Sequence, residues 1–194
     1  EIHSYGRSTF PSVDFLSDNI ALQAKTVLSD FSGRHFIISS GFLQSKPIVS
    51  QSSTEISNSF LVNCAGPVIF AEYIFGQVAD ARIILIGSES GKKGSYDLSY
   101  ALSKCSLRMY VKNKAVKPFQ QLVLISPSTV GDLGMTLRRE DISRLEDYKR
   151  QHPKGRFLTT SELCDVITSV FGLSCYLTNI EIEVNGGKFA LMKY

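Results

Sequence analysis

Apolar residues recur along the chain in two patterns: short unbroken runs, and longer stretches with helical spacing. Residues 81–87 and 121–127 are segments of strand length with apolar side chains on both faces, as strands buried in a parallel sheet have. Residues 35–38 form a third, shorter run of this kind. The stretches between these runs predict helices over residues 18–31, 54–78, 97–115 and 138–151.

The two ends of the chain add further elements. Residues 1–5 predict a short strand, and residues 180–184 alternate apolar and acidic side chains, which is typical of an edge strand with one wet face. Thr159 and Glu162 have the spacing of a capping box, which predicts that a helix begins there. The Ser-rich residues 43–53 predict a loop.

This alternation predicts a single α/β domain over residues 1–194. We expect a doubly wound parallel sheet of the Rossmann type, with helices on both faces and right-handed crossovers. In such sheets, ligands bind beyond the carboxyl ends of the strands. The segments that follow the predicted strands are residues 6–8, 39–41, 87–91 and 127–130. Their polar groups are therefore expected to converge on one edge of the sheet.

The composition narrows the class of protein. With 43% hydrophobic and 20% charged residues, the 194-residue chain is expected to be globular, and its net charge of +3 does not indicate a nucleic-acid partner. Asn63, Glu72 and Gln77 interrupt the apolar stretch of residues 60–78, so no membrane partner is expected. Four separated cysteines and three scattered histidines predict neither a disulfide framework nor a metal site, and favour a reducing, cytoplasmic compartment.

One pair of side chains has the spacing needed to exchange a proton. Tyr100 and Lys104 are four residues apart in a predicted helix, so they lie on one face about one turn apart. Because a nearby ammonium favours phenolate over phenol, we expect the pKa of Tyr100 to be lowered toward neutrality. The spacing alone is weak evidence, since Tyr110 and Lys114 repeat it, and that second pair is expected only to face solvent.

Two other polar residues could join this pair. Ser88 lies at the end of the strongest predicted strand, twelve residues before Tyr100, where its hydroxyl could meet the phenol. Asn63 is a polar residue within an otherwise apolar helix, and it could either take part in the site or cap or cross-link the helix.

Together, these residues carry a resemblance to a known family. A strand ending in Gly87-Ser88, followed by Ser99-Tyr100-Ala101-Leu102-Ser103-Lys104, resembles the Ser, Tyr and Lys signature of the short-chain dehydrogenase/reductases, and Asn63 falls where that family has its catalytic asparagine. Residues 125–130, 153–159 and 176–187 also resemble the family's later segments, so the resemblance covers nearly the whole chain.

The resemblance implies a role for each of these residues. Tyr100 would pass a proton to or from the substrate oxygen, and Lys104 would lower the pKa of Tyr100 and hold the nicotinamide ribose. Ser88 would hydrogen-bond the substrate carbonyl, and Asn63 would anchor a water in a proton relay to Lys104. The protein would then be an NADP-dependent or NAD-dependent oxidoreductase that interconverts a carbonyl and an alcohol.

The cofactor and partners follow from the same resemblance. Arg7 stands where an arginine accommodates the 2′-phosphate of NADP, so NADP is favoured over NAD. The helices over 54–78 and 97–115 would form a homodimer or homotetramer interface. The polar region over about 132–158 favours a polar, sugar-like small-molecule substrate because it holds the charged residues Arg138, Arg139, Glu140, Asp141 and Arg144. The expected cofactor-binding residues are Arg7, Ser8, Asp14, Ser40, Gly41, Tyr100, Lys104, Pro127 and Val130.

The sequence also departs from the family pattern. The glycine-rich turn Gly-x-x-x-Gly-x-Gly is absent, and residues 1–8 resemble the family's second strand and its exit, so a first strand and helix of about 30 residues are expected upstream of residue 1. Ser39-Ser40-Gly41 and Pro127-Ser128 replace the family's Asn-Asn-Ala-Gly and Pro-Gly. The alternative is therefore a non-catalytic relative, a binding or structural protein with a decayed cofactor site.

Overall fold

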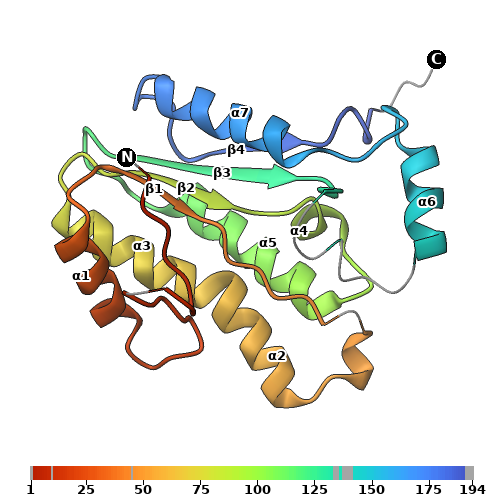
Figure 1. Ribbon diagram of the computed structural model, residues 1–194, viewed down its shortest axis with the longest axis horizontal. Helices are drawn as coiled ribbons and strands as arrows, with labels where there is room; N and C mark the ends of the chain where they lie inside the picture. Colours follow the sequence, from red (N-terminus) through yellow and green to blue (C-terminus); the bar gives the residue numbers. More distant parts are fainter. Residues whose placement is uncertain (1, 10, 45, 133–135, 137–141, 191–194) are drawn as a thin grey trace.

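The four strands in the described part of the chain form one parallel sheet, and their order in the sheet follows their order in the chain (Figure 1). The computed structural model describes all residues except 1, 10, 45, 133–135, 137–141 and 191–194. The strands are β1 (His35–Ile38), β2 (Arg82–Ile86), β3 (Gln121–Pro127) and β4 (Ile180–Val184). All four lie where apolar patterning predicts them, and β4 lies at an edge of the sheet as expected.

The central strands are buried because their side chains are apolar on both faces. In the register, Ile84 of β2 pairs with Val123 of β3, and both side chains point toward one face of the sheet. Their neighbours Ile83 and Leu122 point toward the opposite face and are fully buried there. Each face therefore supplies one wall of a hydrophobic layer, which explains the unbroken apolar runs in the sequence.

Helices cover both faces, as the alternation predicts (Figure 1). On one face lie α1 (Ile20–Asp30), α3 (Gly66–Gln77) and α5 (Leu98–Asn113), whose apolar side chains share one cluster with β1, β2 and β3. On the other face lies α7 (Thr160–Gly172), which begins with the predicted capping box of Thr159 and Glu162. The helix predicted over 18–31 is thus two residues shorter at its start and one at its end.

The helix predicted over 54–78 is a continuous helical stretch in three parts. It consists of α2 (Ser53–Phe60), the π-helical turn η2 (Leu61–Ala65) and α3. By length and composition, Ser53–Gln77 could cross a membrane, but a core helix of a soluble protein meets the same test. Because it packs against α1 and α5 and buries Asn63, we interpret it as a core helix.

The strand predicted over residues 1–5 does not form. Residues 2–5 have irregular structure, and Tyr5 instead packs against the main apolar cluster while its hydroxyl donates to Asp30 Oδ2 at 2.6 Å. Burial and the Asp30 carboxylate raise the pKa of Tyr5 to about 12. A strand needs a neighbouring strand to satisfy its backbone groups, and among the described residues the sheet ends at β1.

The hand of the crossovers differs from the prediction in at least one connection. The β1–β2 and β2–β3 connections place α3 and α5 on one face, whereas the β3–β4 connection places α7 on the other. Since the strand order never reverses, the last connection has the opposite hand. It spans residues 128–179 and includes α6 (Ile142–Gln151), so it is not bound by the packing of a single crossover helix.

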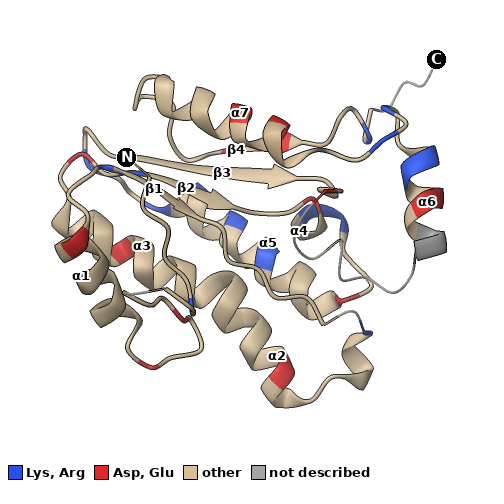
Figure 2. Cartoon of the chain, viewed as in Figure 1, with Lys and Arg blue, Asp and Glu red and all other residues tan. Residues whose placement is uncertain are grey.

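Charged residues are distributed over the helices and loops with both signs interspersed (Figure 2). On β4, the acidic side chains face the α5 side of the sheet, where Glu181 pairs with Arg108 and Glu183 pairs with Lys92 of the short helix α4 (Ser90–Lys93). The remaining short element is η1 (Ile48–Ser50), which lies in the predicted loop of residues 43–53. This distribution agrees with the small net charge of the chain.

Candidate active site

The site forms at the carboxyl edge of the sheet, where α5 begins (Figure 1). Asp97 is the N-cap of α5, and its Oδ1 accepts a hydrogen bond from the backbone N–H of Tyr100 at 3.1 Å. Tyr100 is 7% exposed, and Lys104, one turn further along the helix, is 2% exposed. The predicted pair is therefore buried on the inner face of α5, close to the ends of β1 and β2.

Lys104 reaches across to two neighbouring strands. Its Nζ donates to the backbone carbonyl of Ser40 at 3.1 Å, just after β1, and to that of Ile86 at 2.8 Å, at the end of β2. Burial lowers the pKa of Lys104 to about 8, although nearby Cys64 acts in the opposite direction. An ammonium has three hydrogens, so Lys104 keeps one donor beyond these two carbonyls.

Ser88 and Tyr100 are brought together as predicted, but the electrostatics of the phenol differ from the expectation. Burial is the largest influence and raises the pKa of Tyr100, and the Asp97 carboxylate also raises it, while the hydrogen bond with Ser88 lowers it. The net pKa is raised, so the prediction that Lys104 lowers it is wrong for this structure. The reason is that the Lys104 ammonium faces backbone carbonyls rather than the phenol oxygen.

Asn63 lies in the π-helical turn η2 and cross-links it to the segment that follows β1. Its Oδ1 accepts from the backbone N–H of Phe42 at 2.7 Å, and its Nδ2 donates to the Phe42 carbonyl at 2.9 Å and to Ser59 Oγ at 3.1 Å. Ser40 Oγ donates to the Val62 carbonyl in the same turn. Asn63 and Lys104 therefore hold one segment from two helices, and the predicted water relay between them remains a prediction.

Besides Tyr100 and Lys104, four of the expected cofactor residues lie at this edge. Ser40 accepts from Lys104 through its carbonyl, and Gly41 follows it on the surface. Pro127 ends β3, and its carbonyl accepts from the backbone N–H of Glu89 at 3.0 Å, next to Ser88. Val130 forms an isolated bridge with Leu158, which joins the segment after β3 to the start of α7.

Arg7, Ser8 and Asp14 are not brought into this group. Arg7 and Ser8 are exposed in a turn over residues 6–9, and Asp14 accepts from the backbone N–H of Leu16 before α1. In the described part of the chain, no hydrogen bond or ion pair connects these three residues to Tyr100 or Lys104. The expectation that Arg7 and Ser8 follow a strand is wrong, because residues 2–5 form none.

Of the charged residues taken to favour a polar substrate, 138–141 lie outside the described residues.

Asp97 was not predicted as a site residue, although it is 1% exposed and receives several hydrogen bonds at the start of α5. An aspartate at the first position of the helix predicted over 97–115 is the sequence signal that could have identified it as a cap.

The described residues fit one end of a nicotinamide dinucleotide. The third donor of Lys104 and the adjacent Ser40 backbone suit a ribose hydroxyl, and the buried Tyr100 and Ser88 suit a substrate oxygen beside the nicotinamide. At the other end, the turn Gly-x-x-x-Gly-x-Gly follows none of the four strands described, and Gly87, Gly91 and Gly94 after β2 match it only in part. The nicotinamide half is therefore supported by side chains of this chain, and the pyrophosphate half is not.

No protein-family model matches the sequence, and no curated protein matches it significantly. Solved structures do match. A short-chain dehydrogenase/reductase described as a glucose/ribitol dehydrogenase from Brucella melitensis has a TM-score of 0.80 and 20% identity, covering 92% of this chain and 75% of its own. An NAD+-bound xylitol dehydrogenase has a TM-score of 0.80 and 19% identity, covering 90% of this chain and 77% of its own.

A sorbitol-6-phosphate 2-dehydrogenase from Erwinia amylovora matches with a TM-score of 0.78 and 20% identity, covering 93% of this chain and 78% of its own. At this level of identity the likeness concerns the fold. The chain therefore has the Rossmann-type α/β fold of the short-chain dehydrogenase/reductases, and the resemblance inferred from its motifs is confirmed at the level of the fold.

Proposed function

We propose that the protein is an NAD(P)-dependent oxidoreductase of the short-chain dehydrogenase/reductase kind that interconverts a carbonyl and an alcohol. The observation that carries the proposal is the burial of Tyr100, hydrogen-bonded to Ser88, one helical turn from the buried Lys104. Buried titratable groups with shifted pKa values, gathered at the carboxyl edge of a parallel sheet, are typical of a catalytic site. The dehydrogenase structures that share this fold support the same reaction class.

Each residue has a task in the proposed reaction. When bound, the nicotinamide supplies or accepts the hydride. Tyr100 gives its phenolic proton to the substrate oxygen during reduction, and its raised pKa keeps it protonated at neutral pH for that task. Ser88 donates to the same oxygen and holds it next to the phenol. Lys104 uses its free hydrogen to hold the ribose, and Asn63 fixes the segment that positions Ser40.

The choice of cofactor, substrate and assembly extends this proposal. NADP is favoured by Arg7, whose exposed guanidinium is available to a 2′-phosphate. A polar, polyhydroxylated substrate is supported by the similar folds of the glucose/ribitol and xylitol dehydrogenases. A homodimer or homotetramer is supported by exposed apolar side chains on the long helices, and a reducing cytoplasmic compartment by the four free cysteines. These exposed side chains are Leu61, Ile69, Leu98, Leu102 and Met109.

The second candidate is a non-catalytic protein that keeps the fold. It is favoured by Ser39-Ser40-Gly41 and Pro127-Ser128, which replace the family's Asn-Asn-Ala-Gly and Pro-Gly at the candidate cofactor site. Such a protein would retain the buried tyrosine as a structural residue. The two candidates differ in whether the phenol of Tyr100 is needed for turnover.

The test measures cofactor binding and turnover with the same protein. Fluorescence titration with NADPH and NADH is expected to show binding, tighter for NADPH, and a screen of sugars and polyols is expected to reveal turnover by the absorbance of the reduced cofactor. Tyr100→Phe should keep cofactor affinity and lose turnover. Binding of neither cofactor would overturn the proposed function and favour the non-catalytic candidate.

A further inference from the structure

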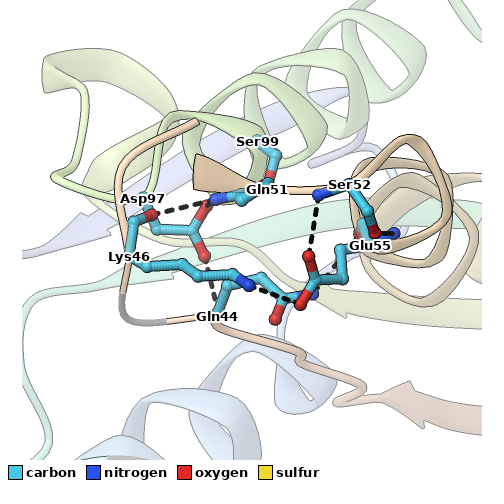
Figure 3. Close-up of polar contacts among 7 residues, drawn as sticks. All are labelled: Gln44, Lys46, Gln51, Ser52, Glu55, Asp97 and Ser99. Atoms are coloured by element: carbon cyan, nitrogen blue, oxygen red, sulfur yellow. Dashed lines mark hydrogen bonds and ion pairs between the residues drawn. The ribbon is translucent and has the colours of Figure 1, made fainter. Parts of the chain in front are cut away.

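Asp97 is a buried carboxylate with an unusual number of hydrogen-bond donors around it. Within α5, it accepts from the backbone N–H of Tyr100 at 3.1 Å and from Ser99 Oγ at 2.8 Å. From the loop after β1, it accepts from the backbone N–H of Gln44 at 2.6 Å and from Gln51 Nε2 at 3.0 Å (Figure 3). Its two oxygens therefore join the first turn of α5 to a loop that is distant in sequence.

No cation neutralises this carboxylate among the described residues. Lys46, the basic residue on the same loop, pairs instead with Glu55 at 2.6 Å, and Glu55 closes the capping box of α2 with Ser52 (Figure 3). A buried charge is costly unless hydrogen bonds satisfy it, and each of the four donors here is directed at Asp97. A helix cap alone needs only a neutral acceptor such as serine. Capping therefore explains neither the charge of Asp97 nor its hydrogen bonds with Gln44 and Gln51 in the loop.

The loop that Asp97 holds is the continuation of the segment held by the other site residues. Lys104 binds the Ser40 carbonyl, Asn63 binds both backbone groups of Phe42, and Asp97 binds the N–H of Gln44. Three side chains thus hydrogen-bond to every second residue of the segment over residues 40–44. Asp97 is the member of this set that also holds the backbone of Tyr100.

We propose that Asp97 is a positioning residue that fixes Tyr100 against the segment after β1, so that the phenol meets Ser88 and the substrate oxygen in one orientation. The inference rests on the proposed function for its effect on turnover, but the geometry it describes exists without substrate. Asp97 touches no reacting atom and acts through the backbone of Tyr100. Its negative charge also favours the neutral phenol, which suits a group that donates a proton.

Two variants distinguish the role of Asp97 as a helix cap from the role of its negative charge. Asp97→Ser keeps a good N-cap acceptor for α5 but removes the charge and the reach to Gln44 and Gln51. Asp97→Asn keeps the shape, but its amide NH₂ then faces the Gln44 N–H, so two donors meet at a contact that is now 2.6 Å. Thr159→Ala is the matched control, because it removes the N-cap of α7, which is remote from α5 in sequence.

Turnover is the first readout. We expect both Asp97 variants to lower kcat by about 10-fold to 100-fold, as small misplacements of a catalytic group do, with little change in the KM for the cofactor. The pH profile of kcat should shift to lower pH, because loss of the negative charge makes the phenolate easier to form. Thr159→Ala should lower the melting temperature and leave both kcat and its pH profile unchanged.

Two readouts do not depend on activity. The ultraviolet difference spectrum between each protein and its Tyr100→Phe counterpart follows the ionisation of Tyr100 alone, and it should titrate at lower pH in the Asp97 variants. Hydrogen exchange should rise in residues 43–52 and in the first turn of α5. If kcat, the phenol titration and the exchange all match those of Thr159→Ala, Asp97 is only a helix cap and the inference fails. If the wild type shows no turnover while titration and exchange change as expected, the proposed function fails and the positioning role stands.

Discussion

Helix α5 carries two Tyr-x-x-x-Lys pairs, one at its start and one at its end, and their surroundings differ. The side chain of Tyr100 is hydrogen-bonded with the hydroxyl of Ser88, and Lys104 donates to two backbone carbonyls. At the other end, the side chains of Tyr110 and Lys114 both bind Glu72 of α3, at 2.7 Å and 2.6 Å. The expectation that the second pair only faces solvent is wrong, since it joins α5 to α3.

The difference shows that the hydrogen-bond partner of each tyrosine, and not the Tyr-x-x-x-Lys spacing, determines what the pair can do. Burial, followed by the Glu72 carboxylate, raises the pKa of Tyr110, and this acceptor binds the phenolic proton directly. The partner of Tyr100 is a neutral hydroxyl, and its hydrogen bond offsets part of the rise in the phenol pKa that burial and the Asp97 carboxylate cause. Lys114 faces a carboxylate, whereas Lys104 is a buried cation without one among the described residues. The first pair is therefore suited to proton transfer, and the second is a structural cross-link.

The largest expected difference is in turnover. Tyr100→Phe should lower kcat by about 100-fold to 10,000-fold, because it removes the only proton that the proposed general acid carries. Tyr110→Phe removes the same atom from the second pair and should leave kcat unchanged. Steady-state kinetics of both variants under one set of conditions make the measurement. Equal losses would show that the two pairs do not differ as argued.

Lys104 should give the protein a distinctive stability profile at alkaline pH. Its pKa is about 8 when folded against an ordinary value of 10.5, so between these values the unfolded chain binds more protons and the free energy of unfolding rises with pH. The rise should amount to roughly 3 kcal/mol relative to Lys104→Met, which lacks the titration. Denaturant unfolding of both proteins from pH 7 to about 10.5 measures it. A parallel profile for Lys104→Met would contradict the burial of the ammonium.

Ser88→Ala should have an effect of intermediate size. Removal of one hydrogen bond to the reacting oxygen is expected to lower kcat by about tenfold. Because the bond from Ser88 lowers the pKa of Tyr100, its loss should move the phenol titration to higher pH, opposite to the shift in the Asp97 variants. The pH profile of kcat distinguishes the two directions, and a shift to lower pH would refute this reading of the Ser88 contact.

Glu72→Gln should have the smallest effect, and on stability alone. Burial raises the pKa of Glu72, but hydrogen bonds from Lys114 and Tyr110 outweigh it, so the net pKa is lowered. The carboxylate therefore contributes stability that is present at neutral pH and lost as the pH falls through the lowered pKa. Because Glu72 is partly exposed, we expect a loss of about 0.5–1 kcal/mol at pH 7, which disappears in acid, with kcat unchanged. Chemical denaturation at both pH values measures it.

Much of the fold could be predicted from local patterns. The largely apolar segment over 121–127 predicts β3 with both of its ends, and the capping box of Thr159 and Glu162 predicts the start of α7. Such features depend on residues that are close in sequence, so the sequence displays them directly. The strand predicted over 1–5 failed because a strand is completed by a neighbour, and residues 2–5 have none in the described structure.

The candidate site was predictable in its members but not in its electrostatics. Tyr100, Lys104 and Ser88 were identified from spacing and from the family signature, and the structure brings them together. The pKa shift of Tyr100 was not predictable, because it depends on burial and on the direction in which the Lys104 ammonium points. The role of Asp97 depends on Gln44, 53 positions away in the chain, and no local pattern indicates that contact.

The sequence by itself determined which segments are strands and helices, where the helices are capped, and which residue types stand at the ends of the strands. These properties follow from backbone propensity and from the period of apolar side chains, and both act over a few residues. Only the tertiary structure decided which face each helix covers, which of two equal Tyr-Lys pairs meets a hydroxyl and which meets a carboxylate. Those outcomes depend on contacts between segments distant in the chain and on burial, which sets the cost of each charge.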